Sequence, residues 1–484
     1  MKTVIIGIDG GTWSSFDRFP GAMPFLSSLK HGSLETTIPT GSAAAWTSFA
    51  TGKNPGKHGI VSWETRPFSG KIATSHDIAA NEIWDMLSKE NISVGVVCPP
   101  ISFPPKHVNG FYVSGIGRPS TEEDFVYPTQ ETENARRYIE DLNTLETVRS
   151  GKSFEAGDKI KKMTENKVSL FLELTKKYDT NFSFILIDEN DRFQHFFWKD
   201  ENALMDYYSL LDAQVRRICD ENRDANVFVL SDHGFHDAPA KHFHINTWLA
   251  NNGYIILGVL DRIKMLLYPA GKALFGRFIR DEPPAWMKRF VPHQETIIKN
   301  IQEKPDFIGF NNFSLFVKDT DKVEEIVSKL KNVKDHDRPV FTGVWQKSEV
   351  YSGPFIDAMP DIVFMMDSDY AINTDFSPFL FSSVKKSPWQ GYHTFAPDAI
   401  IAAFGPDIKE SPAKARIVDI TPTILHMFGA DVPEDCDGRV LTEILKDNKE
   451  VRHSKSPEME RNTGNANEAE DELVKKNLRD LGYM

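Results

Sequence analysis

The chain contains an apolar segment, Val227–Leu230, that ends abruptly at residues 231–234, Ser-Asp-His-Gly. Four consecutive β-forming residues predict a buried strand of a parallel sheet, because such strands are covered on both faces. Open α/β sheets place their ligand sites beyond the carboxyl ends of these strands. Adjacent Asp and His side chains there can offer a carboxylate oxygen and an imidazole nitrogen to one divalent cation. A well-satisfied turn is the alternative that this segment alone leaves open.

Similar junctions between an apolar strand and metal-ligating residues occur at three other places. They are the N-terminal apolar residues before Asp9, a strand expected at 182–187 before Asp188, Asp191 and His195, and His393 just ahead of a strand expected near 399–404. Asp191 and His195 are four residues apart, so one helical turn places them on the same face, which favours Asp191 over Asp188. The candidate ligands are therefore Asp9, Asp191, His195, Asp232, His233 and His393. Three carboxylates and three imidazoles suit two adjacent metal ions with positions left open for substrate.

A candidate nucleophile lies at the start of residues 42–51, which are predicted to form a helix that ends at Gly52. Ser42 is expected to be the N-cap of this helix. A helix N-terminus offers free N–H groups and positive partial charge to a phosphate. A metal-bound hydroxyl at that position can lose its proton and attack phosphorus. The alternative is that Ser42 only caps the helix.

Expected strands and helices alternate along the chain, which predicts a doubly wound α/β core with helices on both faces of a mostly parallel sheet. The core is expected to comprise roughly 1–120, 180–250 and 340–445, within a catalytic domain that spans 1–445. Insertions at about 121–178 and 254–340 are predicted to form a helical and α+β cap.

Three segments have a distinctive composition. Residues 254–291 are amphipathic and locally basic, and we expect them in the cap, with a membrane-surface or lipid-substrate role as the alternative. Residues 446–467 are polar without apolar spacing, which predicts a flexible linker. Residues 468–484 are predicted to form one amphipathic helix with Leu473, Leu478 and Leu481 on its apolar face. This helix is expected to dock on the chain's own surface or, alternatively, to contribute to a homodimer contact.

Several sequence blocks occur in the order found in one family. They are GIDG at Asp9, AAAWTSFATGKNPGKHGI, residues 98–119, DRFQHFFW, SDHGF, residues 243–255 and 349–364, GYHTFAPDAIIAAFGP, and residues 418–429. The chain resembles the type I phosphodiesterase/nucleotide pyrophosphatase branch of the alkaline phosphatase superfamily from Met1 to about Leu445. The resemblance implies an alkaline-phosphatase-like fold and a two-metal site, usually zinc, with Mn²⁺ compatible with the same ligands.

The resemblance also implies a role for each matching residue. One metal would be held by Asp9, Ser42, Asp232 and His233, and the other by Asp191, His195 and His393. The family nucleophile is usually Thr, and Ser42 occupies that position, ten residues before Gly52. The implied mechanism is a covalent phospho-enzyme ester that water then hydrolyses.

The block after HGI departs from the family pattern. Family members that act on nucleotides generally have an Asn there, whereas this chain has Trp63 near that place. Trp63, Lys53 and His244 are the candidate substrate-binding residues. The leaving group is left open among nucleotide, glycerophosphoryl, glycolipid-linked phosphate and phosphonate, so small molecules and lipid- or glycan-linked phosphate esters are the expected substrates.

Composition limits the classes of partner and compartment. The net charge of −13 argues against sequence-independent binding to nucleic acid. Three widely spaced Cys residues, 98, 219 and 436, predict neither a disulfide framework nor a zinc knuckle. No 18-residue apolar segment is present, so no transmembrane segment is expected. The N-terminus lacks the features of a signal peptide, so a cytoplasmic enzyme is expected.

Other functions remain as alternatives. A hydrophobic flank of Trp46, Phe49 and Trp63 would suit the second substituent of a phosphodiester, which favours a phosphodiesterase over a phosphomonoesterase. A sulfatase-like or phosphonate hydrolase would use the same core, but the sulfatase Cys/Ser-x-Pro-x-Arg signature is missing around Ser42. GIDGGT is similar to the first phosphate loop of actin-like sugar kinases, yet no second loop is found. A non-catalytic binding protein disagrees with the complete ligand set.

Overall fold

The computed structural model describes residues 1–65, 71–120, 124–139, 144–255, 308–311, 314–384, 388–393, 398–447, 449–456 and 468–481. These residues belong to two compact units. The first unit comprises Met1–Asp237, Tyr351–Met359 and Pro388–Met484, and the second comprises Ala238–Val350 and Pro360–Ser387. All the candidate metal ligands lie in the first unit.

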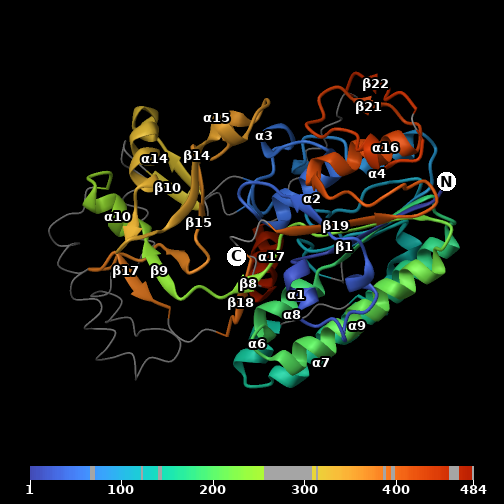
Figure 1. The fold of residues 1–484 in the computed structure, drawn as a ribbon, viewed down its shortest axis with the longest axis horizontal. Coiled ribbons are helices and arrows are strands. Elements are labelled where there is room, and N and C mark those ends of the chain that lie inside the picture. The colour runs from blue at the N-terminus through green and yellow to red at the C-terminus, as the bar shows by residue number, and fades with distance from the viewer. Residues whose placement is uncertain are drawn as a thin grey trace. The chain divides into compact units, whose positions relative to one another are not determined.

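A nine-stranded sheet forms the centre of the first unit in the described part of the chain (Figure 1). Its order is β20 (Lys414–Arg416), β2 (Gly32–Glu35), β19 (Ala399–Phe404), β7 (Asn226–Leu230), β1 (Thr3–Ile8), β6 (Phe182–Ile187), β3 (Val94–Val97), β4 (Gly110–Val113) and β5 (Val126–Tyr127). The strand β1 pairs in parallel with β6 and β7, and β3 pairs in parallel with β6 and β4, whereas β19 is antiparallel to β7 and β2. The mostly parallel α/β sheet is therefore confirmed, and two strands begin and end where the sequence predicts them, at 182–187 and 399–404.

Each central strand contributes to two hydrophobic cores, because successive side chains point to opposite faces of the sheet. In β1, Ile6 and Ile8 belong to one core and Ile5 belongs to the other. In β7, Val229 and Leu230 are divided between the cores in the same way. A strand that is buried on both faces must be apolar at every position, which explains the continuous apolar segments of the sequence.

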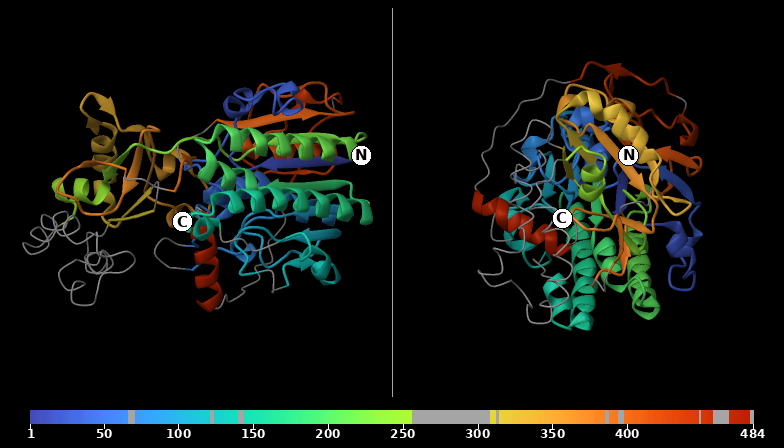
Figure 2. Two further views of the ribbon diagram at one scale, coloured as in Figure 1. Left: turned by 90° about the horizontal axis from the view of Figure 1, so that it is seen from below. Right: turned by 90° about the vertical axis from the view of Figure 1, so that its left-hand side faces the viewer.

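Helices cover both faces of this sheet. The core that contains Ile6 includes residues of α7 (Ser153–Lys177), α8 (Glu189–Phe197) and α9 (Glu201–Glu221). The helices α7 and α9 lie side by side in all three views (Figures 1 and 2). The core that contains Ile5 includes residues of α2 (Ser42–Thr51), α4 (Ile83–Lys89) and α16 (Ile420–Met427). This arrangement places α2 and α8 on opposite faces of one sheet.

The helix α7 lies within residues 121–178, which the sequence assigns to a cap. The structure instead places α7 in the helical layer of the first unit, where Ile160, Leu170 and Leu174 are fully buried. The charged residues that suggested an inserted segment form the exposed side of an amphipathic helix. This segment therefore helps to cover the sheet.

Besides the two-stranded pair of β12 (Lys334–Asp335) and β13 (Arg338–Pro339), the described part of the second unit contains two small sheets. One has the order β10 (Ile308–Asn311), β11 (Ser314–Val317), β15 (Ile362–Met366) and β14 (Phe341–Gln346), with α14 (Val323–Lys331) packed on β14. The other has the order β16 (Tyr370–Asn373), β9 (Lys241–His244) and β17 (Phe381–Ser383). The unit begins before residue 254 and includes Pro360–Ser387, so it is larger than the predicted insertion. Residues 256–307, which include most of the basic segment 254–291, lie outside the described residues.

The C-terminal helix α17 (Glu468–Leu481) is found where the sequence predicts it. Val474 and Leu478 are buried in a cluster with Trp63 and Ala43, whereas Leu473 is 41% exposed. The helix therefore docks on its own chain, and Leu473 does not belong to the docked face. The Leu481 side chain lies outside the described residues.

The predicted linker, 446–467, is only partly described. Its residues His453–Ser454 form β22, which pairs in parallel with β21 (Val432–Pro433), so this part is not a free linker. Backbone pairing needs no apolar side chains, which explains why hydropathy did not reveal it. Residues 457–467 lie outside the described residues.

None of the helices in the described residues has the length and apolar character needed to cross a membrane.

Candidate active site

The candidate ligands meet at one end of the central strands, because the parallel strands before them have their carboxyl ends there. Gly7 of β1 is level with Leu186 of β6 and with Leu230 of β7, so the residues that follow these strands emerge together. The pairing of β18 (Gly391–Tyr392) with β8 (His236–Asp237) brings His393 to the same end. Antiparallel β19 then starts at this end and runs away from it.

Asp191, His195 and His393 form one group, whose ligand atoms lie within 4.8 Å of one another. His195 Nε2 is 3.3 Å from Asp191 Oδ2, and His393 Nε2 is 3.9 Å from Asp191 Oδ1. His195 Nδ1 donates a hydrogen bond to the Gly391 carbonyl at 2.9 Å, which leaves the lone pair on Nε2 directed at the group. The structure thus brings together the three residues that the sequence assigns to one metal.

The second group surrounds His233. Its Nε2 is 3.2 Å from Asp232 Oδ2 and 3.5 Å from Asp9 Oδ1, and its Nδ1 donates to the Gly234 carbonyl at 3.1 Å. Ligand atoms of Asp9, Asp191 and His233 also lie within 4.8 Å of one another. Asp191 is therefore within reach of both groups, although the sequence assigns it to only one.

The site contains three buried carboxyl groups whose pKa values are shifted in different directions. Burial, and then the neighbouring Asp232 and Asp191 charges, raise the pKa of Asp9 well above its usual value. Burial also raises the pKa of Asp232, although His233 opposes this effect. Burial acts on Asp191 in the same direction, but His195 and His393 outweigh it and lower the pKa of Asp191. Carboxylates so close together need positive charge to stay ionised at neutral pH.

The unpaired polar atoms of the site fit divalent cations. Both carboxylate oxygens of Asp191, Oδ2 of Asp232, Nε2 of His195 and Nδ1 of His393 have no hydrogen-bond partner among the described residues. Buried polar atoms are nearly always hydrogen-bonded or bound to an ion. Carboxylate oxygen and imidazole nitrogen together suit Zn²⁺ and also Mn²⁺. The donor set therefore has the composition and burial of a metal centre.

Ser42 is the first residue of α2, and Gly41 precedes the helix as its cap. The predicted bounds of this helix are confirmed, and Gly52 ends it with φ +68°. Ser42 Oγ is 3.3 Å from Asp9 Oδ1 and 3.3 Å from His233 Nε2. Its side chain contacts the ligand group and makes no capping hydrogen bond, so the prediction that Ser42 caps the helix is wrong. The free N–H groups of the first turn of α2 begin beside this hydroxyl.

Asp188, the competitor of Asp191, has a different environment. It forms buried ion pairs with Lys167 and with Arg192, the latter at 3.0 Å. Burial opposes ionisation, but Lys167 and Arg192 outweigh it and lower the pKa of Asp188. The structure therefore places Asp191, and not Asp188, among the ligand atoms, as the DxxxH spacing predicts.

Each of the three candidate substrate-binding residues is paired or packed with other residues of its own unit. Lys53 Nζ contacts Asp435 Oδ2 at 2.5 Å, so its charge is paired. Trp63 is 7% exposed and packs in the cluster with Val474 and Leu478. His244 belongs to the second unit, where its ring nitrogens contact the Asp375 carbonyl at 3.0 Å and Ser382 Oγ at 2.8 Å. Their proposed contact with substrate stays a prediction.

The predicted hydrophobic flank is wrong for Trp46 and Phe49. Trp46 and Phe49 are fully buried in the core that contains Ile5, where they contact Phe184. Since α2 is buried on all its sides, its aromatic residues have no exposed face to offer a substrate. Sequence reasoning also missed Trp46, Asn190, Gln194 and Ser231 as neighbours of the ligands. The last three come directly before Asp191, His195 and Asp232, and this adjacency was the available signal.

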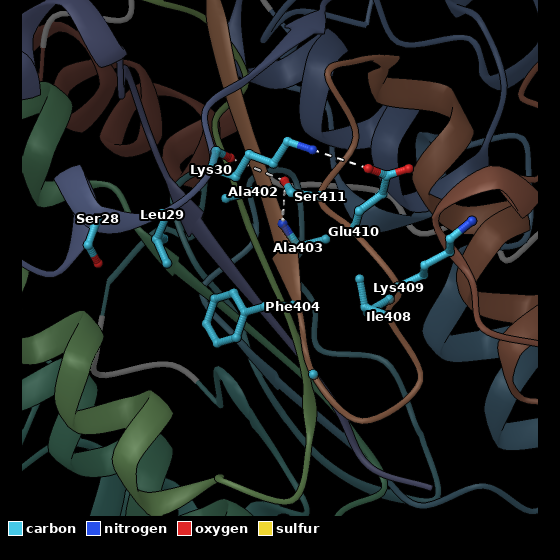
Figure 3. A pocket seen from close by; sticks show the side chains of 11 residues that line it. Ser28, Leu29, Lys30, Ala402, Ala403, Phe404, Ile408, Lys409, Glu410 and Ser411 are labelled. Carbon is cyan, nitrogen blue, oxygen red and sulfur yellow. Dashed lines mark hydrogen bonds and ion pairs between the residues drawn. The ribbon is translucent and has the colours of Figure 1, made fainter.

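A pocket of about 320 Å³ lies elsewhere in the first unit (Figure 3). It is lined by residues 28–30, 402–405 and 408–411, and the ion pair between Lys30 and Glu410 at 3.2 Å is part of its wall. Phe404 is level with Val227 at the start of β7, whereas the ligands follow the end of β7. The pocket and the ligands are therefore at opposite ends of the strands. It contains none of the predicted site residues.

Comparisons with solved structures agree with this fold. The chain is similar to human ectonucleotide pyrophosphatase/phosphodiesterase 5, with 13% identity and a TM-score of 0.57. It is also similar to the murine protein, with 14% identity and a TM-score of 0.54, and to an inactive variant of the murine protein in complex with AMP, with 14% identity and a TM-score of 0.56. Each match covers 92% of this chain and 100% of the other.

A search of curated protein sequences gave no significant match. The model of the family described as type I phosphodiesterase / nucleotide pyrophosphatase matches residues 3–393, which include every candidate ligand and Ser42. The match extends over most of the 484 residues, so the resemblance of the separate sequence blocks is confirmed as a family relationship. The chain is a phosphoric ester hydrolase that belongs to the type I phosphodiesterase / nucleotide pyrophosphatase family.

Proposed function

We propose that the protein hydrolyses phosphodiesters at a two-metal site, with Ser42 as the nucleophile. The contact of Ser42 Oγ with Asp9 and with His233, both at 3.3 Å, is the observation that supports this role. One metal would be held by Asp9, Ser42, Asp232 and His233, and the other by Asp191, His195 and His393. The donor set favours Zn²⁺, with Mn²⁺ as the alternative.

The metals, when bound, would lower the pKa of the Ser42 hydroxyl and neutralise charge on the phosphate. In the first step the bond from Ser42 Oγ to phosphorus forms and the bond from phosphorus to the leaving oxygen breaks. The leaving alcohol takes up a proton, and the phosphate remains as an ester of Ser42. In the second step water attacks phosphorus, and the bond to Ser42 Oγ breaks to restore the hydroxyl. The first N–H groups of α2 would stabilise negative charge on the phosphate oxygens.

A preference for diesters is supported by the pairing of three buried cations of the first unit. A monoester has a second negative charge that requires an additional positive group. Lys53 is paired with Asp435, and Lys167 and Arg192 are paired with Asp188. These cations are not available to neutralise a monoester. The AMP complex of the murine relative also suggests that a nucleotide ester is a reasonable first substrate.

The test combines metal analysis with hydrolysis of bis-p-nitrophenyl phosphate and p-nitrophenyl phosphate. We expect two zinc or manganese ions per chain and faster hydrolysis of the diester. Ser42→Ala should abolish turnover while metal content stays near two, and Ser42→Thr, the matched control with a hydroxyl, should retain activity. Mass spectrometry of the quenched reaction should detect phosphate on Ser42.

Five results would contradict parts of this proposal. Faster hydrolysis of the monoester would indicate a phosphomonoesterase. Turnover of a sulfate ester alone would indicate a sulfatase-like hydrolase, and turnover of a phosphonate alone would indicate a phosphonate hydrolase. Full activity of Ser42→Ala would exclude the covalent intermediate. Undiminished turnover by metal-free protein would exclude the two-metal site.

A further inference from the structure

Three consecutive backbone carbonyl groups after β1 each accept a hydrogen bond from a fully buried side chain. Asn190 Nδ2 donates to the Asp9 carbonyl at 2.7 Å, and Gln194 Nε2 donates to the Gly10 carbonyl at 2.9 Å. Ser231 Oγ donates to the Gly11 carbonyl at 2.8 Å. We name Asn190, Gln194 and Ser231 the loop clamp.

Each residue of the loop clamp directly precedes a candidate ligand. Asn190 and Gln194 are one helical turn apart on α8, and so are the ligands Asp191 and His195 that follow them. One face of α8 therefore holds the β1 loop while the adjacent face presents ligand atoms. Ser231 joins the loop to the end of β7, directly before Asp232.

The loop itself contacts both groups of ligand atoms. The Gly10 N–H donates to Asp232 Oδ1 at 3.2 Å, and Asp9 is a candidate ligand. Gly10 has φ +65°, and a Cβ atom there would lie 3.1 Å from Asp191 Oδ1 and 3.1 Å from Gln194 Nε2. The backbone at Gly10 is thus wedged between the two groups, and a side chain would strain it.

Further hydrogen bonds orient two of the three donors. Tyr208 Oη donates to Gln194 Oε1 at 2.7 Å, and Ser15 Oγ is 2.6 Å from Tyr208 Oη. These two hydrogen bonds fix the orientation of the Gln194 amide, because Oε1 accepts from Tyr208 and Nε2 must then point at the Gly10 carbonyl. The Ile400 N–H donates to Ser231 Oγ at 2.9 Å, so the hydroxyl proton is left for the Gly11 carbonyl.

We propose that Asn190, Gln194 and Ser231 are positioning residues that set the separation of the two metal ions through the β1 loop. The inference rests on the two-metal function proposed above. Five of the ligands come from the β1 loop, from α8 and from the end of β7, and the loop clamp joins α8 and the end of β7 to the β1 loop. Loosening it should keep every ligand present but let the ligand groups move relative to one another, which changes the separation of the two metals and impairs a reaction that requires both.

The test uses the full-length protein loaded with Mn²⁺. Gln194→Met and Ser231→Ala remove one donor each from α8 and from the end of β7. Thr164→Val is the matched control. Thr164 Oγ1 makes a buried hydrogen bond of 3.1 Å to the Ile160 carbonyl, and this bond does not involve the β1 loop. The readouts are Mn²⁺ stoichiometry, the magnetic coupling between the two ions by electron paramagnetic resonance, and kcat and KM separately.

We expect both clamp variants to bind two Mn²⁺ ions with altered magnetic coupling, and kcat to fall about 10-fold to 100-fold while KM changes little. Thr164→Val should keep wild-type coupling and kcat, even if it is less stable. Wild-type coupling and wild-type kcat in both clamp variants would overturn the inference. A wild-type protein that binds no pair of ions would overturn the proposed function as well, so the two failures are distinguishable.

Discussion

The indole Nε1 of Trp46 donates a hydrogen bond to Asp9 Oδ2 at 3.1 Å, and both residues are buried. Trp46 is one helical turn after Ser42 on α2, so the nucleophile helix is joined to a ligand of the proposed metal site. The strand beneath the indole accommodates it through Gly7, where a Cβ atom would lie 2.6 Å from Trp46 Cη2. The absence of a side chain at Gly7 therefore allows the Trp46 indole, and with it α2, to pack close to β1.

Replacement of Trp46 by Phe removes this donor and retains an aromatic ring. Asp9 Oδ2 would then face a partly apolar surface, and its orientation toward the metal would be less restricted. We expect metal affinity or kcat/KM to fall about 10-fold to 100-fold. Trp84→Phe is the control, because Trp84 belongs to the same aromatic cluster and contacts Phe184 but not Asp9. Equal losses in both variants would assign the effect of Trp46 to packing alone.

Asp188 and Asp191 offer a direct test of the DxxxH interpretation. Asp191→Asn should reduce bound metal and activity together, because it removes charge from the ligand group. Asp188→Asn leaves the buried Lys167 and Arg192 with one fewer counter-charge, which should cost about 3–5 kcal/mol of unfolding free energy. Its metal content should stay at two ions per chain at temperatures where it remains folded. Calorimetry and elemental analysis of both variants check this expectation, which the reverse pattern would refute.

Local patterns predict the ligands because each lies in a short segment next to a buried strand. Apolar residues followed by Asp or His specify both the strand and the edge at which it delivers its side chain. His393 obeys the same rule in reverse, since it precedes an antiparallel strand that starts at that edge. These statements need only the neighbouring residues, so one sequence is sufficient.

Interactions between distant segments could not be predicted in this way. The contact of Trp46 with Asp9 and that of Gln194 with Gly10 depend on how α2 and α8 pack against the sheet. An aromatic residue near the nucleophile can equally face substrate, which is why the sequence predicts that Trp46 and Phe49 belong to a substrate-binding flank. The same limit applies to α7, because its charged outer side is also typical of an inserted segment and only the packing of its other side shows that it covers the sheet.

The C-terminal helix should contribute to stability through Leu478. This side chain is fully buried in the cluster with Val474, Trp63 and Ala43, next to the start of α2. Leu478→Ala should lower the unfolding free energy by about 2–5 kcal/mol, as expected for a buried leucine. Leu473→Ala on the same helix is the matched control, because Leu473 is 41% exposed and its loss should change stability by less than about 0.5 kcal/mol. Equal stabilities of the two variants in urea unfolding would show that α17 does not dock through Leu478.

His58 should make the stability of the protein depend on pH. Its side chain is fully buried, with Nε2 2.8 Å from Ser48 Oγ and Nδ1 accepting from the Ile60 N–H at 3.2 Å. Because Nδ1 accepts, the proton of the neutral ring is on Nε2, which donates to Ser48. Burial, with a smaller contribution from the Lys53 charge, lowers the pKa of His58 from 6.5 to about 3.

A lowered histidine pKa means that the unfolded chain binds the proton more tightly than the folded chain. The contribution of neutral His58 is therefore complete above about pH 6.5 and is progressively lost as the pH falls toward about 3. Relative to His58→Gln, the wild-type unfolding free energy should fall by about 2 kcal/mol between about pH 7.5 and about pH 5. Ser48→Ala keeps the imidazole and should retain most of this pH dependence. Urea unfolding of the three proteins measures the effect, and a constant difference between wild type and His58→Gln over this range would show that His58 does not titrate as its burial requires.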